Sequence, residues 1–189
     1  MTLYSLVLFV HLAAVLALCA ALSIELLALY QLGRASTLTE VRRWIQPVPG
    51  LPLLTAGSAL VIFFSGIYLT IRMSAFDLAW PKVTIGALLL IAPFAALTGR
   101  RIRAIRQLCA EGKAINSELI SRLQDPLLNI SLGIRTAVFL AIVLLMSAKP
   151  ELWESIIIVG VSAVFGLLTS LLLWHRPRSL PVPSAGLGD

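Results

Sequence analysis

The sequence predicts an all-α membrane protein, a polytopic bundle of five transmembrane helices with its N-terminus outside and its C-terminus in the cytoplasm. Three observations predict this class. Hydrophobic residues make up 59% of the 189 residues and charged residues only 13%, against roughly 25% charged residues in soluble domains. Five apolar stretches approach the roughly 20 residues that a bilayer requires. The basic residues gather in alternate connecting segments.

The apolar stretches lie near residues 4–32, 51–72, 82–99, 127–147 and 153–174. The first stretch lacks the basic start of a cleaved signal peptide and stays apolar for too long, so we expect it to be a retained span. Residues 1–175 would then form one transmembrane domain. Residues 176–189 are rich in proline and are expected to form a disordered cytoplasmic tail.

The basic residues predict the orientation of the spans. Eleven of the fifteen Lys and Arg residues follow the first, third and fifth apolar stretches, and cytoplasmic loops collect basic residues. The net charge of +6 has the same explanation, so no nucleic-acid partner is expected. Trp153 and Trp174 agree with this topology, because they would bracket the fifth span at a separation of about 31 Å, close to the thickness of the hydrocarbon core.

Two of the cytoplasmic segments are predicted to hold short amphipathic helices. Residues 37–40 (TLTE) form a capping box that begins one such helix, and Pro47 and Pro49 would end it. The segment after the third span contains two amphipathic halves, which we expect to break near Gly112. Its first half holds four clustered arginines, namely Arg100, Arg101, Arg103 and Arg106.

These four arginines favour contact with anionic lipid headgroups and with the lipid bilayer. A nucleotide-phosphate site would be expected to include a glycine-rich loop, and none accompanies the arginines. The cluster is therefore interpreted as a topology determinant that also touches lipid headgroups.

Small residues in the fifth span predict close helix packing. Ser162, Gly166 and Ser170 recur every four residues, a spacing that lets another helix approach closely. The ladder could seat the fifth span on its own bundle or join two copies in a homodimer, and the first use is favoured. Pro93, in the third span, is expected to kink its helix.

Glu25 and Arg135 are charged residues within predicted spans. Glu25 lies nine residues before Arg34 and Arg135 ten residues after Asp125, which places both roughly 14 to 15 Å from the cytoplasmic boundary. Because a charge in hydrocarbon normally has a partner, an intramembrane charge pair is predicted. Its favoured role is to fix which helices are neighbours, and a proton or ion relay through Glu25 is the alternative.

His11 lies in the first span near the predicted outer surface. Histidine and methionine together suit a b-type haem or a soft copper ion, and Met146 or Met73 would lie at a depth that allows contact with His11. A single histidine instead favours a hydrogen bond to a neighbouring helix, so no cofactor is predicted and the haem or copper site is the alternative. Cys19 and Cys109 lack the spacing of a disulfide framework or a zinc site.

Four pieces of sequence carry a family resemblance: FVHLAAVLALCAALSIE, SALVIFFSGIYLTIR, the AW that opens the third span, and LLMSAKP. They resemble an uncharacterised family of predicted bacterial integral membrane proteins, a domain of unknown function that is distantly similar in pattern to the membrane domain of copper-resistance protein D. The resemblance covers about residues 4–150. It implies a four-helix membrane unit extended by a fifth span, and a copper-handling role that would carry over only to His11.

The sequence contains no Ser/His/Asp arrangement, HExxH motif, pair of carboxylates or glycine-rich phosphate loop, so no catalytic activity of its own is expected. The prediction is an integral protein of the bacterial inner membrane that acts as a membrane partner or assembly component, bound to another membrane protein or to a second copy. Two alternatives are a haem- or copper-binding redox protein that uses His11 and a small proton-coupled carrier that uses Glu25.

Overall fold

The computed structural model of the chain describes residues 2–32, 38–45, 50–111 and 125–174, and in these residues the regular structure is helical throughout. Five long helices dominate, namely α1 (Leu3–Leu32), α3 (Leu51–Arg72), α4 (Ala79–Glu111), α6 (Pro126–Ala148) and α7 (Leu152–Trp174). The short helix α2 (Leu38–Ile45) lies between α1 and α3 in the chain, and the 3-10 turn η1 (Ala75–Asp77) lies between α3 and α4.

Each of the five long helices is long and apolar enough to cross a membrane, so the prediction of an all-helical fold with five candidate spans is confirmed. Helix α4 is longer than the predicted third span, because it continues through Pro93 and on to Glu111 as one helix. The first amphipathic half of the following segment is thus an extension of α4. The predicted second half, the break near Gly112 and the tail lie outside the described residues, as do Thr37, Pro47 and Pro49 around α2.

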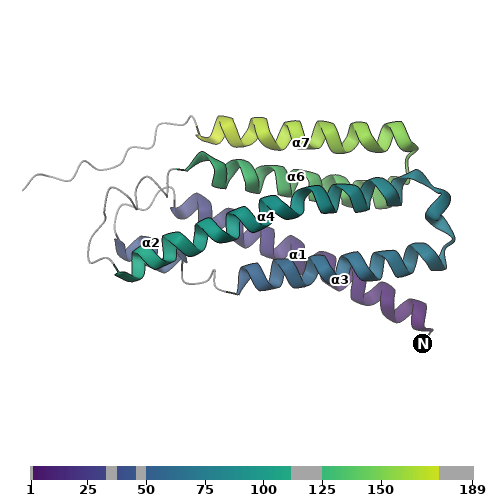
Figure 1. Cartoon of the computed structure of the whole chain (residues 1–189), viewed down its shortest axis with the longest axis horizontal. Coiled ribbons are helices and arrows are strands. Elements are labelled where there is room, and N and C mark those ends of the chain that lie inside the picture. Colours follow the sequence, from purple (N-terminus) through teal and green to yellow (C-terminus); the bar gives the residue numbers. More distant parts are fainter. Residues whose placement is uncertain (1, 33–37, 46–49, 112–124, 175–189) are drawn as a thin grey trace, which may run out of the picture.

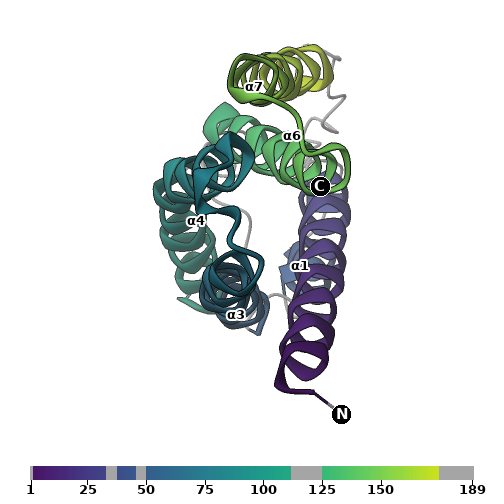
Figure 2. The same cartoon turned by 90° about the vertical axis from the view of Figure 1, so that its right-hand side faces the viewer.

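The long helices lie side by side along one axis (Figure 1). Seen from one end, α1, α3, α4 and α6 surround the centre, and α7 lies outside them against α6 (Figure 2). The most extensive contacts join α6 to α7, α1 to α3 and α4 to α6, whereas α1 touches α6 only sparsely and α3 touches α4 even less. The bundle therefore consists of two helix groups, a first group (α1 and α3) and a second group (α4, α6 and α7).

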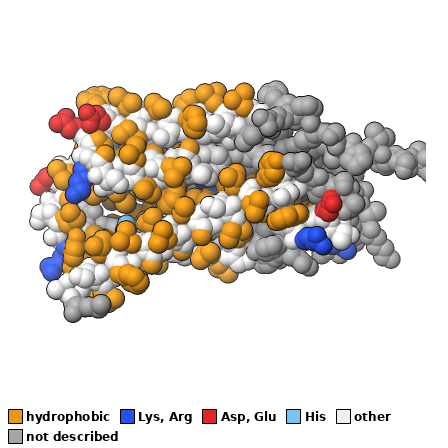
Figure 3. All heavy atoms as spheres, turned by 180° about the vertical axis from the view of Figure 1, so that it is seen from behind, with side chains coloured by type: hydrophobic (Ala, Val, Ile, Leu, Met, Phe, Trp, Pro, Cys, Tyr) orange, Lys and Arg blue, Asp and Glu red, His pale blue; other side chains and the backbone are white. Residues whose placement is uncertain are grey.

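Buried residues follow a seven-residue repeat in the helices that carry the core. In α1 they recur at alternating steps of three and four residues: His11, Ala14, Leu18, Ala21, Glu25, Ala28 and Leu32. Helix α6 repeats the pattern with Leu128, Ser131, Arg135, Val138, Ile142 and Leu145. This spacing is typical of helices packed at small crossing angles with a left-handed twist. The outward faces carry exposed apolar side chains, which are spread along the described part of the surface in Figure 3.

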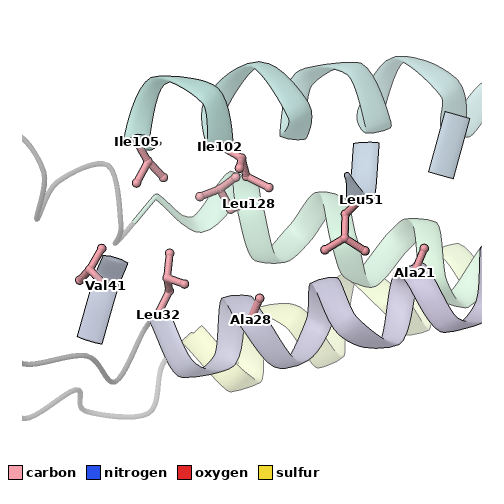
Figure 4. Packing of buried hydrophobic residues seen from close by; sticks show 8 residues of the cluster. All are labelled: Ala21, Ala28, Leu32, Val41, Leu51, Ile102, Ile105 and Leu128. Atoms are coloured by element: carbon pink, nitrogen blue, oxygen red, sulfur yellow. The ribbon is translucent and has the colours of Figure 1, made fainter. Parts of the chain in front are cut away.

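Helix α2 is attached to the bundle through a cluster of apolar residues at one end. The cluster joins α1, α2, α3, α4 and α6 and consists of Ala21, Ala28, Leu32, Val41, Leu51, Ile102, Ile105 and Leu128 (Figure 4). Val41 is only 1% exposed, so α2 is held by its apolar side. We call this end of the bundle the α2 end and the opposite one, where η1 lies, the η1 end.

A candidate functional site between the helix groups

The structure forms the charge pair that the sequence predicts. Arg135 of α6 donates from Nη1 to Oε1 of Glu25 and from Nη2 to Oε2, both at 3.1 Å. Glu25 is 7% exposed and Arg135 4%. Two parallel charge-assisted hydrogen bonds of this kind fix the orientation of both side chains. The pair therefore joins the first helix group to the second in a fixed geometry.

The positions of Glu25 and Arg135 follow from the helical repeat. Each residue occupies a buried step of its own helix, and the apolar residues Leu22 and Leu132 lie one turn away in a common cluster. An isolated charge in such surroundings is costly. The fork of the guanidinium matches the two carboxylate oxygens, so each charge satisfies the other.

Helix α3 begins at the depth of the carboxylate. Its first residue, Leu51, packs in the same cluster as Ala21 and Ala28, which flank Glu25 by about one helical turn on either side. Glu25 itself lies seven residues before the end of α1 at Leu32, or about 10 Å from it. The charge pair is therefore nearer to the α2 end than to the η1 end.

Hydroxyl groups continue the polar layer from α6 to α4. Ser131 lies one turn before Arg135, and its Oγ donates to the carbonyl oxygen of Phe94 at 3.0 Å. Thr98 Oγ1 lies 2.7 Å from Ser131 Oγ and 3.0 Å from the same carbonyl. Thr98 is 1% exposed. Helix α6 thus makes polar contacts with α1 and with α4 through residues one turn apart.

His11 binds the neighbouring helix α3 by a hydrogen bond. Its Nδ1 lies 2.8 Å from Ser65 Oγ, and the Ser65 hydroxyl donates to the carbonyl oxygen of Val61. Because a hydroxyl has one proton, Ser65 accepts from the Nδ1–H of His11. Gly66 leaves space for the ring, since a Cβ there would lie 3.5 Å from His11 Cε1.

The two methionines considered as partners of His11 lie elsewhere. Met146 packs against the cluster of Ala87, Val138 and Ile142 in the second helix group. Met73 follows the end of α3 and is 48% exposed. The described residues contain no group of three or more His, Cys, Asp or Glu side chains that could hold a metal ion. His11 supplies one nitrogen, Nε2, whereas a soft copper site takes several ligands, and the haem or copper alternative stays a prediction.

The small residues of α7 face α6 within the chain. A Cβ on Gly166 would lie 2.6 Å from the carbonyl oxygen of Gly133 and 2.8 Å from Ala137 Cβ. Conversely, a Cβ on Gly133 would meet the Ser170 side chain and the Gly166 carbonyl oxygen. Ser162 is half-buried on the same helix. The ladder is used here for packing between α6 and α7.

The arginine cluster is divided between two environments. Arg101 forms an ion pair with Asp125, whose Oδ1 also accepts a hydrogen bond of 3.0 Å from Leu127 N at the start of α6. Arg100 and Arg103 are exposed. The side chain of Arg106 lies outside the described residues.

Several contact partners of these residues were not predicted from the sequence. Gly133 and Ala137 are small residues at a four-residue step, a signal for close helix packing, but nothing in the order of spans indicated that this face of α6 would meet the ladder of α7. Ser65 and Gly66 adjoin one another in a span, and such a pair is a signal for close approach of a side chain from another helix. Ser131 and Arg135 share a helix face at a step of four, which could have indicated a polar layer.

The five apolar helices and the interhelical charge pair define a multi-pass helical membrane protein. No protein-family model matches the chain, and comparisons with curated proteins and with solved structures found no match either.

Proposed function

We propose that this chain is a multi-pass protein of the bacterial inner membrane that acts as a membrane partner or assembly component and has no catalytic activity of its own. The carrying observation is the mutual satisfaction of Glu25 and Arg135 by two hydrogen bonds of 3.1 Å. A pair of this geometry specifies which helices are neighbours, and each charge is occupied by the other instead of being available to a substrate. A bundle held in this way presents fixed outer helices to a partner.

The peripheral helix α7 is the candidate surface for that partner. It contacts the bundle through one stripe, and its other side exposes large apolar residues such as Val161, Phe165 and Leu172. In a membrane, these side chains face lipid or another membrane protein. The partner in this proposal is a membrane protein or a second copy of the chain.

Cross-linking in native membranes tests this proposal. A photoreactive residue in place of Val161 should give a discrete product larger than the chain, and one in place of Leu140, exposed on α6, serves as the control. The Arg135→Ala variant should lose the product, while the exchanged pair Glu25→Arg with Arg135→Glu should restore part of it. A chain that remains uncross-linked at every outward position of α7 would contradict the partner role.

The orientation is proposed from the distribution of charge. Exposed basic residues at the α2 end include Arg43, Arg100 and Arg103, and cytoplasmic segments collect such residues. The N-terminus would then be outside and the C-terminus in the cytoplasm. Reporter fusions after Ala148 and after Trp174 should lie on opposite sides of the membrane, the second one in the cytoplasm.

A small proton-coupled carrier is the second candidate. It is favoured by the location of Glu25, a buried carboxylate whose partner belongs to the other helix group. Separation of the groups would require that the charge pair break, and protonation of Glu25 would release Arg135. The Glu25→Gln variant should then abolish proton uptake that depends on a solute in proteoliposomes. Unchanged uptake in this variant would eliminate the carrier.

A further inference from the structure

The contact between α1 and α6 stops before the η1 end. Ala14 of α1 and Phe139 of α6 lie in one buried cluster. Seven residues before Ala14 on the same face, Val7 is only half-buried, and four residues after Phe139, Val143 is 37% exposed. Figure 2 shows the same divergence, since the N-terminal part of α1 lies away from α6. We call the space between Val7 and Val143 the α1–α6 opening, and in a membrane it faces lipid.

His11 lies at the inner edge of the α1–α6 opening. It precedes Ala14 by three residues on the buried face of α1 and is 5% exposed. Figure 3 shows a histidine side chain in pale blue between apolar side chains toward the η1 end, and the other histidine of the chain, His175, lies outside the described residues. A polar ring is thus placed where a molecule from the membrane can reach it.

The contact with Ser65 determines which nitrogen of His11 remains available. The Ser65 hydroxyl donates to the carbonyl oxygen of Val61, so Nδ1 carries the proton that His11 shares with Ser65. The ring is expected to be neutral, because a charge within a span is costly without a partner and Glu25, the acid of the same helix, is paired with Arg135. In a neutral imidazole with the proton on Nδ1, Nε2 has a lone pair and no proton.

Nε2 of His11 is therefore a hydrogen-bond acceptor, and no residue in the described part of the chain donates to it. His11 lies eight residues after the start of α1 at Leu3, or about 12 Å along the helix. At this depth the headgroup of a phospholipid is out of reach. A molecule that satisfies Nε2 must carry a hydroxyl or N–H donor on an apolar body.

We propose that the α1–α6 opening is a binding site for a membrane quinol. A quinol combines an apolar ring, two hydroxyl groups and an isoprenoid tail, so it brings a donor into the hydrocarbon layer. One hydroxyl donates to Nε2 of His11, and the apolar parts lie along Val7 and Val143. Helix α7 lies on another side of α6 (Figure 2), so the site is separate from the proposed partner surface.

The position of the proton predicts a preference between two redox forms of the ligand. A quinone has carbonyl oxygens, which only accept hydrogen bonds and find no donor at Nε2. The full-length chain in mild detergent, kept free of oxygen, should bind decylubiquinol about tenfold more tightly than decylubiquinone. Native mass spectrometry measures the bound ligand. The dimethyl ether of the quinol has the ring but no donor, and should bind as weakly as the quinone. Equal binding of the three compounds would overturn the site.

Two variants test whether His11 is the source of this preference. His11→Phe should remove it, whereas the matched control His175→Phe should keep it. Ser65→Ala removes the acceptor of the Nδ1 proton, so the proton can move to Nε2 and the quinone should bind nearly as well as the quinol. A tenfold preference that persists in His11→Phe or in Ser65→Ala would overturn the proposal. If His11→Phe does not fold, Ser65→Ala decides.

Two further measurements locate the ligand and define its class. The ¹⁵N signal of His11 Nε2 should shift when quinol is added to the labelled chain in micelles, and bound quinol without such a shift would place the ligand elsewhere. Dodecanol also has a hydroxyl and an apolar body, but its flexible chain loses more conformational freedom on binding than a rigid ring does. It should not displace the quinol at equal concentration, and displacement would overturn the assignment to a quinol.

Discussion

Helix α6 contacts α1 and α7 in opposite ways. Its contact with α1 is sparse and is centred on the bidentate bond between Arg135 and Glu25. Its contact with α7 is the most extensive of the bundle and contains the backbone approach of Gly133 to Gly166. The first interface depends on two specific side chains, and the second depends on the absence of side chains.

The difference shows how one helix selects two neighbours in a medium without a strong hydrophobic force between helices. Acyl chains are as apolar as leucine, so specificity comes from polar groups or from close packing. Helix α6 uses a charge on one side and a glycine on another. Each interface should therefore respond to a kind of substitution that leaves the other unchanged.

The largest effect is expected from the Arg135→Ala variant. It strands the carboxylate of Glu25 in the bundle, and breaking a buried pair in this way costs about 3 to 5 kcal/mol. The free energy of unfolding in mixed micelles is the measurement. Adding Glu25→Ala should recover part of the loss, because the double variant strands no charge. Simple additivity of the two single changes would show that the residues do not interact.

The Gly166→Ala variant should be the next most severe. Its new methyl group would overlap the Gly133 carbonyl and Ala137, and overpacking of this kind typically costs about 1 to 3 kcal/mol. Gly160→Ala is the control, because a Cβ on Gly160 has nothing within 4 Å. Unfolding in mixed micelles should separate the two variants. Equal free energies of unfolding in the two variants would mean that α7 can move away from α6 to accommodate the methyl group without a loss of stability.

The Ser65→Ala variant tests a smaller polar contact, within the first helix group. It removes the acceptor of the His11 Nδ1–H and leaves a buried donor without its partner, at a cost of about 1 kcal/mol. Ser23→Ala is a matched control, since Ser23 is exposed and bonds only to Cys19 of its own helix. If Ser23→Ala lowers the stability by as much as Ser65→Ala does, the effect comes from replacing a serine within a helix and not from losing the hydrogen bond between His11 and Ser65.

The smallest expected effect belongs to Ser131→Ala, which removes one hydroxyl from the contact between α6 and α4. Hydrogen bonds between membrane helices contribute about 0.6 kcal/mol on average. Ser147 bonds to Val143 of its own helix and is exposed, so Ser147→Ala should leave the unfolding free energy unchanged. An effect of Ser131→Ala as large as that of Arg135→Ala would show that the polar layer acts as one unit.

Much of this architecture could be predicted because membrane constraints act on short windows of sequence. The length and apolarity of the five helices follow from bilayer thickness, and the depth of Glu25 and Arg135 follows from the helical rise. The partner of Gly166 could not be predicted, because the order of helices around a bundle is decided by contacts between distant segments. The continuation of α4 beyond the apolar stretch also depends on tertiary packing, since Ile102 and Ile105 become buried only when α1, α2 and α6 are in place.

The sequence separation of the charge pair has a consequence for synthesis. Glu25 and Arg135 are 110 residues apart, so a ribosome that adds about 5 to 20 residues per second delivers the arginine roughly 5 to 20 s after the acid. During this interval α1 can pack against α3, which is synthesised earlier, but Glu25 does not yet have Arg135 as its partner. The pairing of α1 with α6 therefore takes place after α1 has been inserted into the membrane. The nascent protein passes through a stage in which α1 is present and α6, the fourth span, has not yet been synthesised.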